Sequence, residues 1–349
     1  MPKIIFLLTL HLCSKSTNQM KRILYLFLFC ILFVSCRKAY QEKKGTIFRT
    51  LYQVKYQSNS SLEEKIDATL EAFDLSLNPF NPNSILSKVN RNEEVEVDQW
   101  FTVVFNKAMK VSEQSNGLFD VTAAPLINLW GFGFEHYDEI SPEIIDSLKT
   151  FVGYRKVRLE GRRVVKDDPR IILNFSAIAK GYACDVIATL LEQEGVENYL
   201  VDIGGEITAK GKSASGVCWI IGINDPEGEA IYMHSAYKEF VQLCEKSGLA
   251  TSGDYINFYI KDNKKIAHTI DPRTGYPAEQ DILSATIVAP DCMTADAYAT
   301  AFMAMGVEAA CRMADQTPQI EYYIIYAKDD DSVGIKFSKG MSSKLVGWK

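Results

Sequence analysis

Apolar and polar residues alternate along this chain with two different periods, which predict a mixture of strands and helices. From Gly45 to Gln57 the apolar positions recur at every second residue, as in a half-buried strand. Residues 61–77 repeat their apolar side chains every three or four positions, which predicts an amphipathic helix. Ser61 and Glu64 have the spacing of a capping box at its start.

The remaining pattern continues this mixture. The predicted helices lie at residues 99–114, 177–195 and 292–306. The predicted strands lie at residues 170–175, 199–207, 217–225, 239–243, 256–262, 264–270, 282–290 and 320–328, with a hairpin at 156–167. Strands and helices do not alternate strictly, so the pattern favours an α+β fold over a doubly wound sheet.

Composition indicates a globular protein. The chain has 349 residues, of which 47% are hydrophobic, and this is enough for a substantial core in one domain or two lobes. Its net charge of −6 argues against a general nucleic-acid binder, which would carry a basic patch. No segment beyond residue 40 is apolar for long enough to span a bilayer.

The first 36 residues are typical of a targeting leader. Two basic residues, Lys21 and Arg22, precede an apolar run from residue 23 to residue 34, and Ser35 then precedes Cys36. This ending is similar to the lipobox of bacterial lipoproteins, in which the cysteine is lipidated.

We therefore expect Met20 to be the true start and Cys36 to carry a lipid anchor in the bacterial cell envelope, on the inner or the outer membrane. An uncleaved membrane anchor remains the alternative. Residues 37–44 are expected to be a charged linker before a domain over residues 45–349.

Five cysteines lie beyond the leader, at positions 184, 218, 244, 292 and 311. Their number is odd and no two have CxxC spacing, so we expect neither a zinc site nor a disulfide framework. Small buried side chains are the expected role for most of them.

Two segments have residues suited to a metal and a phosphate. Asp296 and Thr300 are four apart on a predicted helix, so they share a face and offer hard oxygen ligands for Mg²⁺. Ser176 is placed to cap a helix whose first turn holds Lys180 and Gly181, which suits a phosphate. Spacing alone also fits ordinary capped, solvated helix starts.

Two further segments are candidates for holding a ligand. In residues 115–133, the rings of Phe119, Trp130 and Phe132 are candidates for the wall of a flat ring system, and Asp120 for an acceptor. A core loop with buried aromatic residues fits the same pattern.

In HTIDPRTGYP, residues 268–277, His268 comes three residues before Asp271 and is a candidate general base. Asp254 lies one predicted hairpin earlier. A structural histidine fits this pattern equally well.

The order of these segments along the chain carries more information than any one of them. NPFNPNSILSKVN, SNGLFDVT, LWGF, SAIAKGYACD, VDIGGEI, ATSGDY, HTIDPRTGYP and MTADAYAT together resemble the ApbE family of FAD:protein FMN transferases. The resemblance implies a mixed fold of predominantly antiparallel sheets with packed helices. It also implies transfer of FMN from FAD to a Thr or Ser hydroxyl of an extracytoplasmic acceptor protein, through a phosphoester bond and with release of AMP.

The resemblance assigns the site residue by residue. Mg²⁺ would be held by Asp296, Thr300 and the backbone carbonyl of Ala177. FAD would contact Phe80, Leu118, Phe119, Asp120, Asn174, Lys180 and Ile270. Asp254, His268 and Asp271 would lie near the reacting phosphates.

Two positions depart from the family pattern: residue 80 is Phe where many members have Tyr, and residue 174 is Asn where Asp is usual. Two other functions stay open, namely a Mg²⁺-dependent FAD pyrophosphatase and a non-catalytic FAD-binding lipoprotein. The sequence does not name the acceptor.

Overall fold

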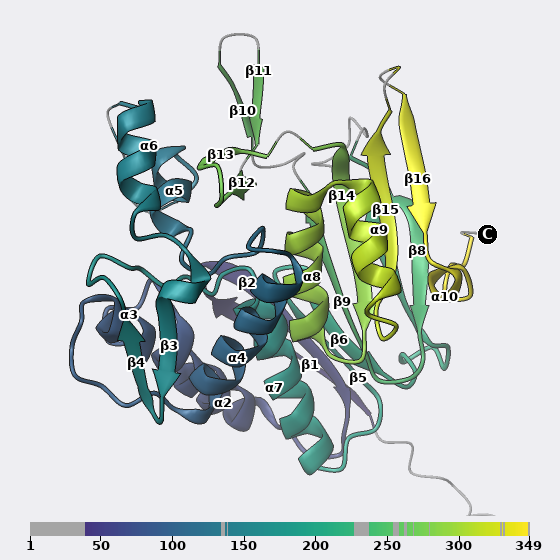
Figure 1. Cartoon of the computed structure of the whole chain (residues 1–349). Coiled ribbons are helices and arrows are strands. Elements are labelled where there is room, and N and C mark those ends of the chain that lie inside the picture. Colours follow the sequence, from purple (N-terminus) through teal and green to yellow (C-terminus); the bar gives the residue numbers. More distant parts are fainter. Residues whose placement is uncertain are drawn as a thin grey trace, which may run out of the picture. The chain divides into compact units, whose positions relative to one another are not determined.

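A single antiparallel sheet organises the chain (Figure 1). The computed structural model describes residues 39–133, 137, 139–226, 237–253, 258–261, 264–267, 269–278, 280–328, 330 and 332–347. The eight strands of the sheet run in the order β1-β2-β5-β6-β9-β14-β15-β16, and every neighbouring pair is antiparallel. Their bounds are Tyr40–Ile47, Thr50–Gln57, Tyr199–Ile203, Glu206–Lys210, Ser247–Gly253, Ile282–Ala289, Glu321–Ala327 and Val333–Phe337. The predicted α+β class is confirmed.

The first two strands correct the sequence prediction of one strand after a linker. β1 and β2 form a hairpin in which Ile47 lies opposite Thr50, so Phe48 and Arg49 make a two-residue turn. Both turn residues have positive φ, 52° and 60°, as this kind of tight hairpin requires. Residues 40–44, expected in the linker, therefore belong to the sheet.

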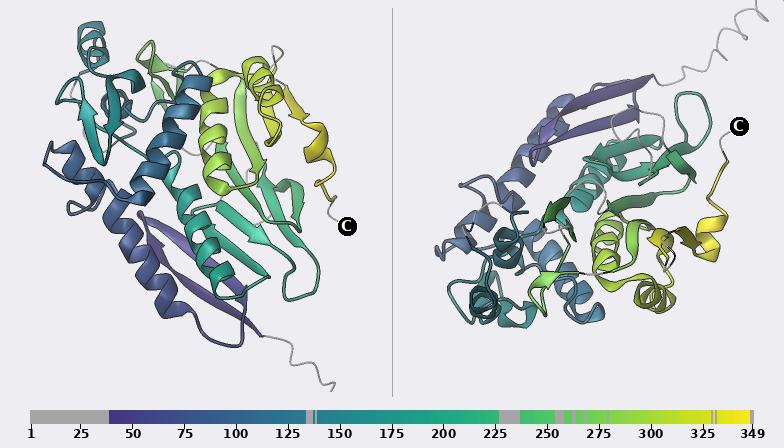
Figure 2. Two further views of the ribbon diagram at one scale, coloured as in Figure 1. Left: turned by 60° about the horizontal axis from the view of Figure 1, so that its bottom comes forward. Right: turned by 90° about the horizontal axis from the view of Figure 1, so that it is seen from above.

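Helices cover one face of the sheet (Figure 2). They are α2 (Glu63–Leu77), α4 (Gln99–Gln114), α7 (Ala179–Gln193), α8 (Cys292–Met305) and α9 (Val307–Asp315). In α8 every residue except Thr300 and Met305 is buried, because this alanine-rich helix packs against β9, β14 and α7. A helix that is apolar on all sides belongs in the core.

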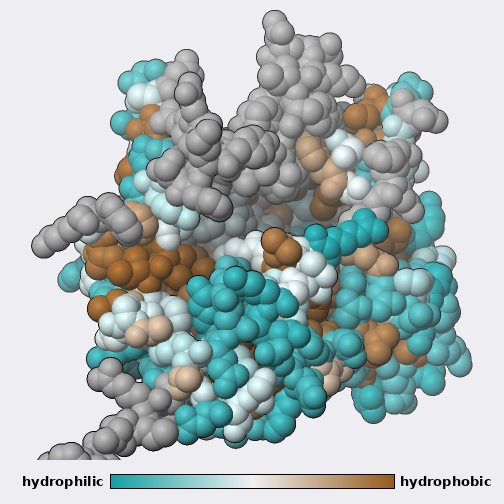
Figure 3. Space-filling view, turned by 180° about the vertical axis from the view of Figure 1, so that it is seen from behind, coloured by the Kyte–Doolittle hydropathy of each residue, from teal (hydrophilic) through white to brown (hydrophobic). Residues whose placement is uncertain are grey.

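The other face is covered by a two-stranded ribbon of β7 (Trp219–Asn224) and β8 (Tyr237–Leu243), together with α10 (Lys339–Ser342). Large apolar side chains remain exposed there on β7, β8 and β16, namely Ile220, Tyr237, Ile335 and Phe337. Figure 3 views the molecule from this side and shows apolar surface among hydrophilic surface.

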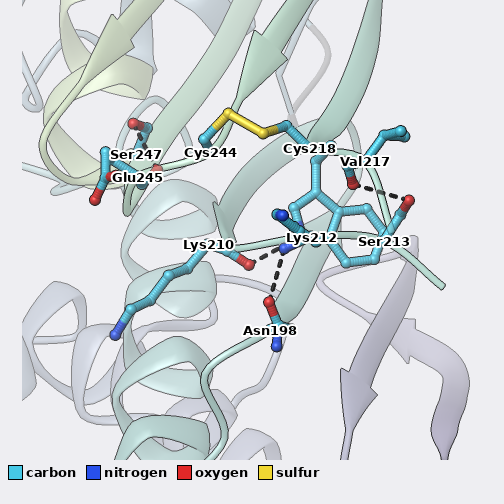
Figure 4. Close-up of a disulfide and its surroundings, with 10 residues drawn as sticks. Asn198, Lys210, Lys212, Ser213, Val217, Cys218, Cys244, Glu245 and Ser247 are labelled. Atoms are coloured by element: carbon cyan, nitrogen blue, oxygen red, sulfur yellow. Dashed lines mark hydrogen bonds between the residues drawn. A yellow bond between two sulfur atoms is a disulfide. The ribbon is translucent and has the colours of Figure 1, made fainter. Parts of the chain in front are cut away.

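A disulfide between Cys218 and Cys244 closes the open end of this ribbon (Figure 4). Trp219 pairs with Leu243, and this register brings the two cysteines to a Cα–Cα distance of 4.9 Å. The sequence predicted no disulfide framework; this disulfide corrects that prediction, because cysteine spacing does not reveal strand register. Cys184 and Cys292 are free and buried, as expected.

Smaller elements lie around the sheet and its helices. The helices are α3 (Ile85–Asn90), α5 (Ala124–Leu129) and α6 (Pro142–Lys149) with a 3₁₀ turn at Tyr154–Lys156, and the hairpins are β3–β4 (Val157–Glu160, Arg163–Lys166), β10–β11 (Phe258–Lys261, Lys264–Ala267) and β12–β13 (Ile270–Asp271, Tyr276–Pro277). α3 and β3 contribute buried residues to the main core, whereas α5 and α6 share a separate small apolar core that includes Ile171 and Ile270. No helix within the described ranges is long and apolar enough to cross a membrane.

Four local predictions were wrong. Residues 199–207, predicted as one strand, contain a turn at Gly204 and Gly205 between the antiparallel strands β5 and β6. Neither α2 nor α7 has a side-chain cap: Ser61 accepts a hydrogen bond only from Glu63 N, and Ser176 lies in the turn before α7 begins at Ala179. Residues 170–175 are not a strand, although Ile171, Leu173 and Phe175 are fully buried as their pattern indicated. A buried apolar run needs a pairing partner before it becomes a strand.

Candidate active site

The start of α7 touches α8 at a glycine. The Gly181 N–H donates to Asp296 Oδ2 at 3.0 Å. A Cβ built on Gly181 would lie 2.8 Å from Asp296 Cβ and closer still to the carbonyl oxygen of Cys292. Only glycine allows this approach. The fold thus brings together the two segments that the sequence assigned to phosphate and metal.

Lys180 adds a positive charge beside Asp296. Its ammonium forms an ion pair with Glu206, the first residue of β6. Burial alone would lower the pKa of Lys180, but the carboxylates of Asp296 and Glu206 outweigh it and raise the pKa above its ordinary value. Glu206 was not among the predicted site residues, because no residue spacing links it to Lys180.

The oxygen ligands predicted for Mg²⁺ come from α8 and from the turn before α7. Asp296 is 3% exposed, and burial raises the pKa of its carboxyl against the influence of Lys180 and Gly181. Thr300, one helical turn further, is half-buried with its hydroxyl 3.4 Å from Ser252 Oγ. Ala177 is half-buried four residues before Gly181.

This donor set fits Mg²⁺. A carboxylate, a hydroxyl and a backbone carbonyl are hard oxygen ligands. In the described part of the chain no three His, Cys, Asp or Glu side chains gather around one point. Mg²⁺ needs no such cage, because it keeps several waters and binds substrate phosphates.

A second aspartate, also missed by sequence analysis, fixes the start of α8. Asp185 on α7 accepts hydrogen bonds from Cys292 N at 2.9 Å, Met293 N at 2.8 Å and Thr208 Oγ1 at 2.8 Å. The first two N–H groups of α8 are therefore satisfied by a neighbouring helix, and Asp291 accepts from the third, that of Thr294. This contact holds Asp296, one turn along, in register with α7.

The segment HTIDPRTGYP forms a tight hairpin from Thr269 onward. Asp271 Oδ1 accepts from Arg273 N at 2.9 Å and from Arg273 Nε at 3.0 Å, while Oδ2 accepts from Arg273 Nη2 at 2.8 Å. Gly275 N donates to the Asp271 carbonyl at 2.8 Å. Asp271, predicted near the phosphates, thus has both carboxylate oxygens bonded within its own turn.

The hairpin rests on α5 and α6. The Trp130 indole N–H donates to the Gly275 carbonyl at 2.8 Å, and the Trp130 ring lies 6.0 Å from that of Tyr276. Ile270 is 6% exposed within the small core. Two of the predicted segments, LWGF and HTIDPRTGYP, are therefore packed together, and the Ile270 side chain serves the packing.

The loop at residues 117–122 is bonded to the chain around residue 153. Asp120 accepts from Thr122 N at 2.8 Å through Oδ1 and from Tyr154 N at 2.7 Å through Oδ2. Phe119 is 2% exposed in the main core, so the predicted aromatic wall does not include it. Leu118, next to it, is half-buried.

Two other predicted FAD contacts are half-buried. Phe80 has the guanidinium of Arg49 over its ring, 4.1 Å from the centroid. Asn174 donates its N–H to Val121 O at 2.8 Å and accepts from Ser176 N at 2.8 Å through its side chain. Asn174 thus orders the turn containing Ala177. Asp254, His268 and Cys36 lie outside the described residues, so their assignments stay predictions.

The sequence profile of the ApbE family matches residues 48–324 of this chain. The chain belongs to the ApbE family. An FAD:protein FMN transferase of Vibrio cholerae serotype O1 is 33% identical over 313 residues, covering 86% of this chain and 92% of the relative. Its counterpart in Escherichia coli (strain K12) is 31% identical over 315 residues, covering 87% of this chain and 88% of the relative.

Solved structures agree with this membership. The flavin transferase ApbE from Vibrio cholerae superposes with a TM-score of 0.77 at 31% identity, covering 88% of this chain and all of that one, 100%. The flavinyl transferase ApbE from Pseudomonas stutzeri has a TM-score of 0.77 at 26% identity, covering 89% and 98%. The resemblance stated from sequence motifs is confirmed at the level of the whole domain.

Proposed function

We infer that this protein is an FAD:protein FMN transferase that moves FMN from FAD to a Thr or Ser hydroxyl of a target protein. The acceptor oxygen bonds to the phosphorus of the FMN half, the pyrophosphate P–O bond breaks, the hydroxyl proton passes to a base, and AMP leaves. The observation that carries this inference is the contact of Asp296 with Gly181 beside Lys180. It places the carboxylate proposed to hold the metal next to an ammonium that can bind phosphate, at the first turn of α7.

The chain's own residues supply positioning and charge, on which phosphoryl transfer mainly depends. Lys180 would bind the pyrophosphate oxygens. Asp296, Thr300 and the Ala177 carbonyl would hold Mg²⁺, which when bound neutralises charge on the phosphates. Asp271 holds the hairpin that directly follows His268, the proposed base.

We further propose that the protein is anchored to the outside of a bacterial membrane through lipidated Cys36. The Cys218–Cys244 disulfide supports this placement, because disulfides persist in oxidising compartments. Incorporation of labelled palmitate into the wild type, and its loss in Cys36→Ala, tests the anchor. Equal labelling of both chains would refute it.

The reaction is tested with the full-length chain in detergent, FAD, Mg²⁺ and a candidate extracytoplasmic flavoprotein as acceptor. Intact mass of the acceptor and chromatography of FMN and AMP are followed together. We expect an acceptor heavier by one FMN, an equal amount of AMP, and loss of both with EDTA or in Asp296→Ala. Asp315→Ala, an exposed acid at the end of α9, serves as the matched control and should remain active.

Two results would contradict the proposal. Free FMN and AMP with every tested acceptor unmodified would indicate a pyrophosphatase. Bound FAD with neither product would indicate a carrier.

A further inference from the structure

Glu206 is a buried carboxylate whose hydrogen bonding is incomplete. It is 6% exposed, one oxygen pairs with Lys180, and the other, Oε2, has no hydrogen-bond partner within the described part of the chain. A buried polar atom without a partner costs free energy. Replacing a buried ion pair by apolar side chains is often neutral or stabilising. Stability therefore does not explain why Glu206 is here, and an unsatisfied buried group calls for another reason.

The backbone holds Glu206 firmly in this place. The residue follows the Gly204–Gly205 turn, in which both glycines have positive φ, 68° and 99°. A Cβ built on Gly204 would lie 3.4 Å from Glu206 Oε2 and 2.9 Å from Thr50 Oγ1. The turn thus leaves room for the Glu206 carboxylate, which reaches Lys180 on α7.

Charge shows what Glu206 adds. Lys180 and Asp296 alone would cancel, so a divalent cation would enter a neutral site beside an ammonium group. When all three groups are ionised, the cluster has two carboxylates and one ammonium, and one net negative charge remains for the cation. The same carboxylate holds the ammonium by a direct ion pair.

We infer that Glu206 is a positioning residue for Lys180, and that it balances the lysine so that lysine and Mg²⁺ can act on the same pyrophosphate. The inference rests on the proposed function. It assigns to Glu206 two separable effects: its charge sustains metal affinity, and its length sets where the ammonium meets the substrate.

The test measures two dissociation constants on the full-length chain in detergent: that of Mn²⁺ by electron paramagnetic resonance, and that of FAD by calorimetry with Mn²⁺ present. Glu206→Gln should weaken Mn²⁺ binding about tenfold, because the Lys180 ammonium then repels the cation at short range. It should also weaken FAD binding about tenfold, because the ammonium loses the carboxylate that positions it. Lys180→Met should bind Mn²⁺ at least as tightly as the wild type and FAD less tightly.

Glu206→Asp separates charge from length. It keeps the carboxylate on a shorter stem, so Mn²⁺ affinity should return to the wild-type value while FAD affinity stays low. Glu192→Gln is the matched control, because it removes a carboxylate that pairs with Lys210 and Lys246 at the far end of α7. It should change neither constant.

If Glu206→Gln alone does not fold, the double variant Lys180→Met/Glu206→Gln carries the test, since it removes both members of the buried ion pair together. Its Mn²⁺ dissociation constant should be within about threefold of the wild-type value, because one positive and one negative charge are removed together. Its FAD binding should stay weak, because the Lys180 ammonium is absent.

Wild-type constants in Glu206→Gln, wild-type FAD affinity in Glu206→Asp, or a double variant that loses Mn²⁺ would overturn the inference. A wild-type chain that binds neither Mn²⁺ nor FAD would overturn the proposed function as well.

Discussion

Two buried aspartates, Asp296 on α8 and Asp271 in the hairpin, serve different ends. They are 3% and 8% exposed. Asp271 has both oxygens bonded to Arg273, two residues away. Within the described residues, Asp296 accepts one hydrogen bond, from Gly181 to Oδ2. The difference teaches that burial alone does not mark a ligand site: a carboxylate is available to a ligand when its own chain has not satisfied it.

The two aspartates also differ in what holds them. Asp271 is positioned locally, by a turn that contains its own counter-ion. Asp296 is positioned by distant parts of the chain, because α8 is fixed by Asp185 at its start and by the glycine contact with α7. Substitutions near Asp296 should therefore disturb chemistry, and those near Asp271 mainly the hairpin.

The largest expected effect comes from neutralising each aspartate in turn. Asp296→Asn should lower kcat/KM for FMN transfer about a thousandfold and abolish Mn²⁺ binding, because it removes the carboxylate proposed to hold the metal. Asp271→Asn should lower kcat/KM only about tenfold and leave Mn²⁺ affinity unchanged. Steady-state kinetics and Mn²⁺ titration measure both. Equal losses in the two variants would remove the contrast.

Removing the disulfide should lower stability at a place remote from both aspartates. Cys218→Ser/Cys244→Ser should lower the free energy of unfolding by about 2–4 kcal/mol, since the unfolded chain regains entropy. FMN transfer below the melting temperature should persist, because the ribbon covers the sheet face opposite α8. Chemical denaturation and a transfer assay check this; loss of transfer in a folded variant would contradict it.

Gly181→Ala should disturb the Asp296 region and leave the Asp271 hairpin unchanged, because it pushes α8 away from α7. Alanine normally stabilises a helix relative to glycine by about 0.5–1 kcal/mol. Here the added methyl would meet Asp296 and Cys292, so we expect a loss of about 1–3 kcal/mol and weaker Mn²⁺ binding. Gly347→Ala, with open space around its Cβ, is the control and should be neutral. A Gly181→Ala chain as stable as the wild type would show that the helices can separate freely.

The smallest expected effect is in the hairpin support. Trp130→Phe removes the indole donor to Gly275 O and should cost about 0.5–1.5 kcal/mol of stability. We expect KM for FAD to rise a few-fold with Mn²⁺ affinity unchanged, because only the Asp271 side is loosened. A changed Mn²⁺ constant would mean that the two regions are coupled.

Much of the fold and part of the site could be predicted from residue patterns. The helix at 99–114, the hairpin at 156–167 and the helix at 292–306 follow from periodicity and turn residues, and the structure confirms them. The four-residue spacing of Asp296 and Thr300 predicts that they lie on the same face of one helix, and both are on α8. The family could be recognised from the order of the motifs, because each motif is a short continuous segment that can be read directly from the sequence.

What the sequence determined by itself was local: periods, turns and the residue types of each motif. Only the tertiary structure decided which carboxylates remain available. Glu206 on β6 pairs with Lys180 on α7, and Asp185 on α7 accepts from the first residue of α8, far away in sequence. Cys218 meets Cys244 because of the register of β7 and β8. The physical reason is that hydrogen-bond satisfaction and close approach depend on what packs nearby, and that is set when the sheet and helices come together.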